Sequence, residues 1–247
     1  MRRERHGLAD VVGWQLFGSV GCLVGVEPKE FTCNIPTSWY TWSMNTLPTS
    51  ARAKLLNAAL QEVRTSGYEA ATVDGLCRAA GVTKGAFFHH FRSKEELGVE
   101  ATRYWNETTG ALFEAADYHK FEDPLDQLIA YVDFRRELLV GRSIPEATCL
   151  LGTMVQETYA TNPTLREACR IGIDSHAATI ATIVAAAKAR HAPKALWSAE
   201  GLALHTQAVI QGSYVLAKAH NDLAIAADSI LHLRRYIEFL FHYGKEE

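Results

Sequence analysis

One stretch, from Thr72 to Leu97, restricts the possible folds of this chain more than any other part of it. It predicts two short helices joined by a tight turn at Gly81, because glycine readily adopts the backbone conformation that such a turn needs. Thr72 and Thr83 stand where their side chains can cap the two helices. The spacing therefore predicts a helix, a turn and a second helix within about 20 residues.

A third helix is predicted directly after this pair. Ser93, with Glu96 three residues later, has the pattern of a capping box at the start of a helix. Apolar residues recur at helical spacing through the whole stretch, so the helices can share one small core. The residues assigned to this core are Val73, Leu76, Cys77, Ala80, Val82, Phe87 and Phe91.

The second short helix leaves a small, partly basic surface outside this core. The major groove of DNA accepts such a helix, so the unit is predicted to be a helix-turn-helix. Lys84 can read a guanine or contact a phosphate, and both readings stay open. Thr72, Thr83 and Lys94 can hold phosphates, although capping alone explains the two threonines equally well. The residues predicted to contact DNA are Arg52, Thr72, Thr83, Lys84, Gly85, Ala86, Phe88, His89 and Lys94.

The segment from Ala51 to Leu97 resembles the TetR/AcrR family of bacterial transcriptional regulators. The resemblance implies an all-α protein, in which an N-terminal helix-turn-helix DNA-binding domain is followed by a helical ligand-binding and dimerisation domain. Several short motifs carry it, and their number and spacing make it specific. They are Gly67-Tyr68 after the first helix, the turn from Ala80 to Gly85, the aromatic-His-Phe ending from Phe87 to Phe91, and the cap from Ser93 to Glu95.

The resemblance also implies a function. Members of this family are ligand-responsive regulators, so we expect a repressor that a small-molecule effector releases from a palindromic operator. Double-stranded DNA with an inverted repeat, the effector and a second copy of the chain are the expected partners, and the cytoplasm is the expected location. An activator with the same architecture is not distinguished by the sequence.

The motif departs from the family pattern at three positions, and two of them, Phe88 and Gly75, leave an alternative open. Phe88 stands where the family usually has a tyrosine that reaches a phosphate, and Cys77 stands where it usually has an alanine. Gly75, inside the first helix of the motif, costs about 1 kcal/mol against alanine. The alternative is a small-molecule-binding or protein-interaction module of the same fold, without specific operator binding.

The distribution of charge agrees with a DNA-binding head. The chain has 247 residues and a formal net charge of −3. Residues 44–100 carry seven basic and six acidic residues, whereas residues 101–247 carry fourteen and eighteen. Because phosphates repel the acidic part, this asymmetry helps to orient the protein on DNA.

The sequence offers no pattern for catalysis, for a metal or for a cofactor. The nucleophile-elbow, phosphate-loop, dinucleotide-binding and zinc-protease motifs are all missing. The five cysteines form no paired spacing, which is typical of a reducing compartment. Cys149 or Cys169 can be read as a redox sensor, but a small buried apolar residue is the favoured reading. His89 and His90 point about 100° apart on a helix and make a poor chelate.

Residues 1–43 lie outside the resemblance. They begin with a basic segment and a short apolar run that superficially resembles a signal peptide, but the run is too short to span a bilayer. We interpret them as an N-terminal extension, either a mis-assigned start before Met44 or a disordered segment. The expected domains are then residues 44–97 for DNA binding and 98–247 for effector binding and dimerisation.

Residues 98–247 are expected to be helical throughout. One helix runs from Lys94 to about Ala116, and Asp123-Pro124 opens another with apolar residues on one face. A third begins at Pro145 and ends at the Asn162-Pro163 step, and a long helix then runs to about Arg190. The effector pocket, expected to favour an apolar or weakly polar molecule, is predicted among Trp105, Phe113, Tyr131, Phe134, Cys149, Met154, Tyr159 and His176.

The last two predicted helices carry apolar residues at alternating spacings of three and four, joined by a turn at Asn221-Asp222. In the family that the chain resembles, this pair meets its symmetry mate in a four-helix bundle. The alternative is that both stripes face the domain's own core, and dimerisation is favoured over it. The residues predicted at the dimer interface are Leu202, Val209, Gly212, Leu216, Leu223, Ile230, Leu233 and Ile237.

Overall fold

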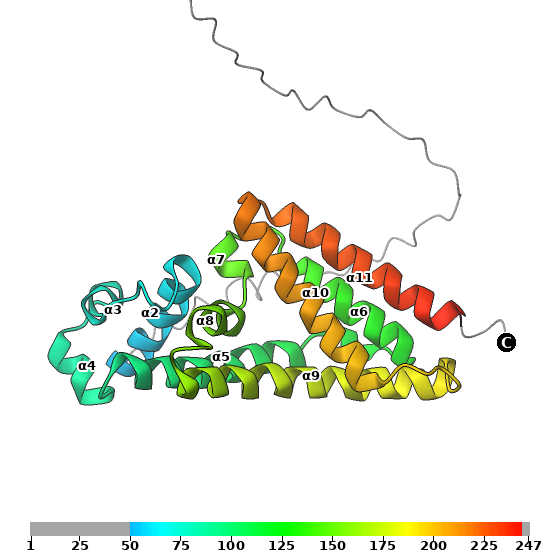
Figure 1. The fold of residues 1–247 in the computed structure, drawn as a ribbon, viewed down its shortest axis with the longest axis horizontal. Coiled ribbons are helices and arrows are strands. Elements are labelled where there is room, and N and C mark those ends of the chain that lie inside the picture. The colour runs from blue at the N-terminus through cyan, green and yellow to red at the C-terminus, as the bar shows by residue number, and fades with distance from the viewer. Residues whose placement is uncertain (1–49, 244–247) are drawn as a thin grey trace, which may run out of the picture. The chain divides into compact units, whose positions relative to one another are not determined.

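The computed structural model describes residues 50–243, and within that range every regular element is a helix (Figure 1). The all-α fold class is therefore confirmed. The proposed extension, residues 1–43, lies outside the described residues. The elements are α2 (Ala51–Ser66), α3 (Val73–Ala80), α4 (Lys84–His90), α5 (Lys94–Glu114), the short 3-10 helix η1 (Asp117–Lys120), α6 (Pro124–Glu137), α7 (Ile144–Ala147), α8 (Leu150–Thr158), α9 (Pro163–His191), α10 (Ala199–His220) and α11 (Leu223–Tyr243).

The helix-turn-helix forms from the local signals that predicted it. The Thr72 hydroxyl accepts a hydrogen bond from the backbone N–H of Gly75 at the start of α3, and Thr83 does the same for Ala86 in α4. Gly81 has φ of +63°, in the left-handed region that favours glycine, and ends α3. These bonds satisfy backbone groups that helix ends leave unpaired.

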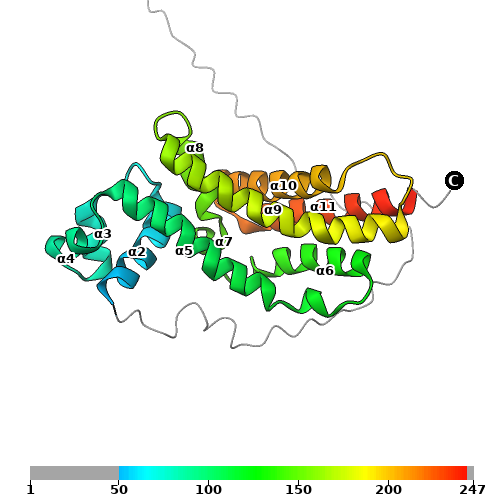
Figure 2. The same ribbon diagram turned by 90° about the horizontal axis from the view of Figure 1, so that it is seen from below.

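The helix α5 connects the head to the rest of the protein (Figure 2). The Ser93 hydroxyl accepts from the N–H of Glu96, as the capping pattern predicts. The Glu96 carboxylate, however, accepts from the N–H of Arg92 rather than from that of Ser93. The side-chain cap thus reaches one residue further back and joins the end of the α4 segment to the start of α5.

Two buried clusters form the core. The first contains the head residues together with Leu150 and Met154 from α8 and Leu165 from α9. The second is built by α6, α9, α10 and α11, around residues such as Leu128 and Ile180. The core of the head is therefore continuous with α8 and α9, so a movement of these helices changes the packing of the head.

The segment after Pro145 differs from the prediction. A single helix to residue 162 was expected, whereas the structure has two helices, α7 and α8. The break falls at Thr148 and Cys149, whose backbones are both extended. The extended backbone packs the Thr148 side chain inward, where it is 1% exposed.

The apolar seam predicted on α11 does not form a free surface. Ile230, Leu233 and Ile237 are buried in the protomer's own core, where α11 packs against α6 and α10. Side chains that are already covered have no area left to bury against a second copy, so their assignment to the dimer interface is wrong. On α10, Leu202 is buried in the same core.

The exposed apolar side chains of α10 and α11 lie on a different stripe. Gly212 and Leu216 are exposed, and Val209 and Leu223 are partly buried. The large apolar residues that join them on the surface were not predicted. They are Leu204, Val215, Tyr236 and Phe239.

None of the helices between residues 50 and 243 is both long enough and apolar enough to cross a lipid bilayer.

Candidate functional site

The α4 helix presents one face to solvent and buries the other. Lys84, Gly85 and His89 are exposed, and the ring of Phe88 is 57% exposed. The neighbouring Phe87 is 0% exposed and anchors the helix in the core of the head. A seven-residue helix is too short to persist alone in water, so this packing holds the exposed face in place.

Lys84 is the first helical residue of α4 and lies at the centre of the predicted DNA contacts. Its ammonium group forms an ion pair of 2.6 Å with the carboxylate of Asp74 on α3. Both side chains are well exposed, and such pairs stabilise a protein by about 1 kcal/mol at most. Lys84 can therefore leave Asp74 for a guanine or a phosphate at small cost.

Gly85 offers a test of whether this face approaches another surface. A Cβ atom built at Gly85 meets only the Thr83 hydroxyl, at an ordinary 3.7 Å. We expect Gly85→Ala to leave the free energy of unfolding unchanged or to raise it by up to about 1 kcal/mol, because alanine favours a helical backbone. Since the added methyl group projects from the exposed face, DNA affinity should fall in an anisotropy titration. Unchanged affinity would exclude close approach of DNA at this position.

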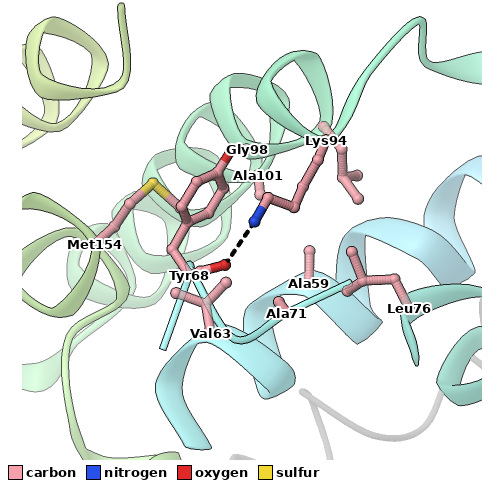
Figure 3. Close-up of a pocket in the computed structure, with 10 residues that line it drawn as sticks. Ala59, Val63, Tyr68, Ala71, Leu76, Lys94, Gly98, Ala101 and Met154 are labelled. Atoms are coloured by element: carbon pink, nitrogen blue, oxygen red, sulfur yellow. Dashed lines mark hydrogen bonds between the residues drawn. The ribbon is translucent and has the colours of Figure 1, made fainter. Parts of the chain in front are cut away.

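Arg52 and Lys94 are placed differently from the rest of the predicted contacts. Arg52 is exposed and forms an ion pair of 2.6 Å with Glu100, so it remains near the surface of the head. The Lys94 ammonium instead lies over the Tyr68 ring and donates to the Tyr68 carbonyl oxygen at 3.1 Å (Figure 3). It also donates to the carbonyl oxygen of Glu69 at 3.4 Å. These two hydrogen bonds to the loop before α3 occupy the ammonium group, so Lys94 acts here as a structural residue of the head.

The cavity in Figure 3 is too small for an effector. It lies between the head and α8, and its lining includes Met154, Tyr68 and Lys94. Its volume is about 10 Å³, about the space that one water molecule needs. Burial, with help from nearby carboxylates, raises the pKa of Tyr68 to about 12, so this phenol stays protonated.

A larger cavity lies between α8 and α10. Its volume is about 210 Å³, and both α8 and the extended residues before it contribute to the wall. The Lys218 ammonium at this site donates to the Thr153 hydroxyl at 2.7 Å, and burial lowers the pKa of Lys218. The lining consists of Thr148, Cys149, Gly152, Thr153, Gln156, Glu157, Gln211, Tyr214, Val215 and Lys218.

The residues predicted for the effector pocket separate into groups. Only Cys149 lines this larger cavity. Met154 lies in the core beneath the head, Trp105 packs against the same core, and Tyr159 is exposed at the end of α8. The remaining four residues form one packed aromatic cluster in the second domain: Phe113, Tyr131, Phe134 and His176.

The aromatic cluster contains buried polar groups that lie close to one another. The Tyr131 hydroxyl and His176 Nε2 are 2.9 Å apart. Burial, together with the nearby Arg135 charge, lowers the pKa of His176 to about 3, so the imidazole is neutral at physiological pH. Arg135 itself is 7% exposed, and its guanidinium lies over the Phe113 ring, 5.1 Å from the centroid.

Arg135 was not predicted from the sequence as a site residue. Followed by Arg136 near the end of α6, it reads as part of a solvated basic helix terminus. One signal was present, since Leu128, Tyr131 and Val132 mark the buried face of this helix and position 135 falls at the same spacing. A charged residue on a buried face points to an unusual partner.

Two protein-family descriptions match the chain. "Bacterial regulatory proteins, tetR family" matches residues 55–101, which include the helix-turn-helix. "Tetracyclin repressor-like, C-terminal domain" matches residues 124–233, which include the larger cavity and most of the second core.

Individual proteins agree with these matches. The transcriptional regulator AcuR of Cereibacter sphaeroides is 28% identical over 110 residues, 44% of this chain and 50% of AcuR. The HTH-type transcriptional repressor AcnR of Corynebacterium glutamicum is 43% identical over 56 residues, 23% of this chain and 30% of AcnR. The chain thus spans at most about half the length of these curated relatives. A TetR transcriptional regulator structure from Chloroflexus aurantiacus superposes with a TM-score of 0.65 at 29% identity, covering 76% of this chain and 94% of that one.

Proposed function

Because the chain belongs to the TetR family of bacterial regulatory proteins, we propose that it is a transcriptional repressor that leaves its operator when a small molecule binds. The observation that carries the proposal is the exposed face of α4, held outward by the burial of Phe87. The relatives are named as regulators and repressors, so no enzymatic activity is proposed. A regulator of this kind acts on DNA in the cytoplasm.

The proposed DNA contacts fall into two groups. Lys84, Gly85 and His89, with the partly exposed Ala86 and the exposed Phe88, face the major groove. Thr72, Thr83 and Arg52 lie beside them, where hydroxyl and guanidinium groups can reach phosphates. Phe88 has no hydroxyl and contributes apolar contact alone.

A homodimer provides the second half of the reading surface. The exposed apolar residues of α10 and α11, among them Leu204, Leu216 and Tyr236, form a face that a second copy can cover. A Cβ atom at the exposed Gly212 would meet nothing within 4 Å in the protomer, so the helix surface is open to a close neighbour there. Two heads related by a two-fold axis read an inverted repeat.

Effector binding can reach the head through α7 and α8. The Arg64 guanidinium of α2 donates to the carbonyl of Glu146 in α7 at 3.2 Å. The Glu157 carboxylate of α8 accepts from the N–H of Glu69, in the loop before α3, at 2.9 Å. A ligand that moves α7 or α8 therefore shifts the head, to the extent that it binds the two states with different affinity.

Lys84→Ala tests the DNA-reading role of α4. Loss of the ammonium should weaken specific binding by about 1–3 kcal/mol and relax sequence preference. Fluorescence anisotropy against the upstream DNA of the gene, with unrelated duplex as competitor and fixed salt, measures both. Lys120→Ala is the matched control, because Lys120 is also exposed and paired with an aspartate, Asp117, but lies in η1.

The same titration decides between the proposal and its alternative. If both variants bind the specific DNA with the same affinity as the unchanged protein, Lys84 does not contact the DNA bases. If competitor DNA abolishes the binding of the unchanged protein and of both variants, that binding reflects nonspecific attraction to phosphates alone. That result would favour a ligand-binding or protein-interaction module without an operator.

A further inference from the structure

Arg135 carries a buried charge without an acidic partner. One guanidinium NH₂ donates to the Tyr214 hydroxyl at 3.1 Å, while the Nε–H has no acceptor. Across residues 50–243, no carboxylate lies within ion-pair distance of Arg135. A buried charge with neither a counter-ion nor full hydrogen bonding destabilises a protein, and such groups are normally paired.

The Arg135 guanidinium nevertheless stays protonated. Burial acts to lower its pKa, but the nearby phenol oxygens of Tyr214 and Tyr131 outweigh that effect and the pKa is raised. The protein therefore keeps a positive charge in its interior at every physiological pH. Phe113 under the guanidinium offers cation–π stabilisation, which is weaker than an ion pair with good geometry.

A second buried polar atom without a partner lies in the wall of the larger cavity. The Thr148 hydroxyl is buried and has no hydrogen-bond partner. Among the described residues, Arg135 Nε and Thr148 Oγ1 are the buried side-chain polar atoms left without one. Tyr214 connects the two, because it lines the same cavity as Thr148 and its hydroxyl accepts from Arg135, which lies directly behind the wall.

Two cationic side chains, Lys218 and Arg135, lie at or behind the wall of this cavity. The Lys218 ammonium lines the cavity, and the Arg135 guanidinium donates to the hydroxyl of Tyr214, which also lines it. The cavity also includes one carboxylate, that of Glu157, which already accepts a backbone N–H from the head. Lys218 and Glu157 balance each other in the lining, so the unpaired charge of Arg135 leaves this region with an excess of positive charge.

We propose that the effector is a small carboxylate, bound in the cavity between α8 and α10 with its negative charge drawn to Arg135 and the Thr148 hydroxyl. The inference rests on the proposed effector-controlled repressor and names the chemistry of its ligand. A cavity of about 150 Å³ admits benzene, so a cavity of about 210 Å³ suits one ring or a short chain with a carboxylate. This replaces the apolar or weakly polar effector expected from the sequence, which rested on the absence of a polar cluster.

Matched pairs of ligands test the charge requirement. Thermal denaturation of the full chain is measured with benzoate and cyclohexanecarboxylate, and with the neutral benzamide and cyclohexanecarboxamide of the same shape. The carboxylates should raise Tm in a concentration-dependent way, and the amides should not. Inorganic phosphate is the third arm and should leave Tm unchanged. A lack of any shift with the carboxylates, or an equal shift with amides or phosphate, would overturn the proposal.

Two variants locate the site. Arg135→Met keeps the length of the side chain and removes its charge, so carboxylate affinity should fall at least tenfold. Thr148→Val keeps the shape and removes the hydroxyl, and it provides a second test if Arg135→Met does not fold. Retained carboxylate affinity in the folded variants would also overturn the proposal.

The binding readout does not involve DNA, so the two proposals can fail separately. Carboxylate binding without release of DNA would leave the ligand site standing and contradict the repressor mechanism. Specific DNA binding without any carboxylate binding would leave the DNA-binding role standing and contradict the ligand site.

Discussion

Phe87→Ala is expected to destabilise the DNA-binding head by about 3–5 kcal/mol, the usual cost of removing a fully buried aromatic side chain. Phe87 is completely buried and packs edge-on or tilted against the rings of Phe88 and Phe91, at centroid distances of 5.1 and 5.9 Å. Since the short α4 depends on this anchor, DNA binding should be lost along with the fold. Urea denaturation followed by circular dichroism measures the loss of stability.

Phe88→Ala is the matched control, one residue further along the same helix. More than half of the Phe88 side chain is exposed, so the free energy of unfolding should change by about 0.5 kcal/mol or less. Any loss of DNA affinity in this variant would then report contact with DNA rather than unfolding. Equal destabilisation by the two substitutions would contradict the assignment of opposite faces to α4.

Ile230→Ala is expected to lower the free energy of unfolding by about 2–5 kcal/mol, at every protein concentration. Ile230 is 0% exposed and lies in the second core with α6 and α10 around it. Denaturation at two protein concentrations a hundredfold apart separates this loss from a loss of dimerisation, because a dimer's stability depends on concentration. A loss of stability seen only at the lower protein concentration would instead indicate that Ile230 lies at the dimer interface.

Leu216→Asp is the complementary change on the exposed stripe of α10. Leu216 is 48% exposed in the protomer, so the core should tolerate the substitution. A charge in the middle of an apolar interface should instead dissociate the dimer, which sedimentation velocity detects. A variant that remains dimeric would exclude this stripe as the interface.

Local chemistry made the head predictable from its sequence. Thr72, Thr83 and Gly81 each act within four residues of their own position, through a cap or a left-handed turn. Such short-range interactions can be predicted from the spacing of residues in the sequence. The structure reproduces the motif for that reason.

The second domain depends on distant contacts, which spacing alone does not specify. The regular seam of Ile230, Leu233 and Ile237 marks a buried face, but a protomer core and a dimer interface produce the same pattern. Lys94 was assigned to phosphate because it begins a helix, whereas the loop carbonyls of Tyr68 and Glu69 reach it first. Only the folded arrangement shows which partner a side chain meets.

The polar cluster was missed for a related reason. Arg135 and Tyr214 are 79 positions apart in the chain, and each looks ordinary within its own helix. Their meeting beside Thr148 and Cys149 depends on how α6 and α10 pack and on the break before α8. A site made from three distant segments has no local pattern to recognise.

In the proposed function, two α4 helices, one from each copy of the chain, read an inverted repeat. Selection of bound sequences from a pool of random DNA duplexes by the full chain, at fixed and stated salt, tests it most directly. We expect recovery of one palindromic site that is bound by two copies of the chain and that Lys84→Ala no longer enriches. Recovery of no common sequence, or of a site that Lys84→Ala enriches equally well, would contradict it.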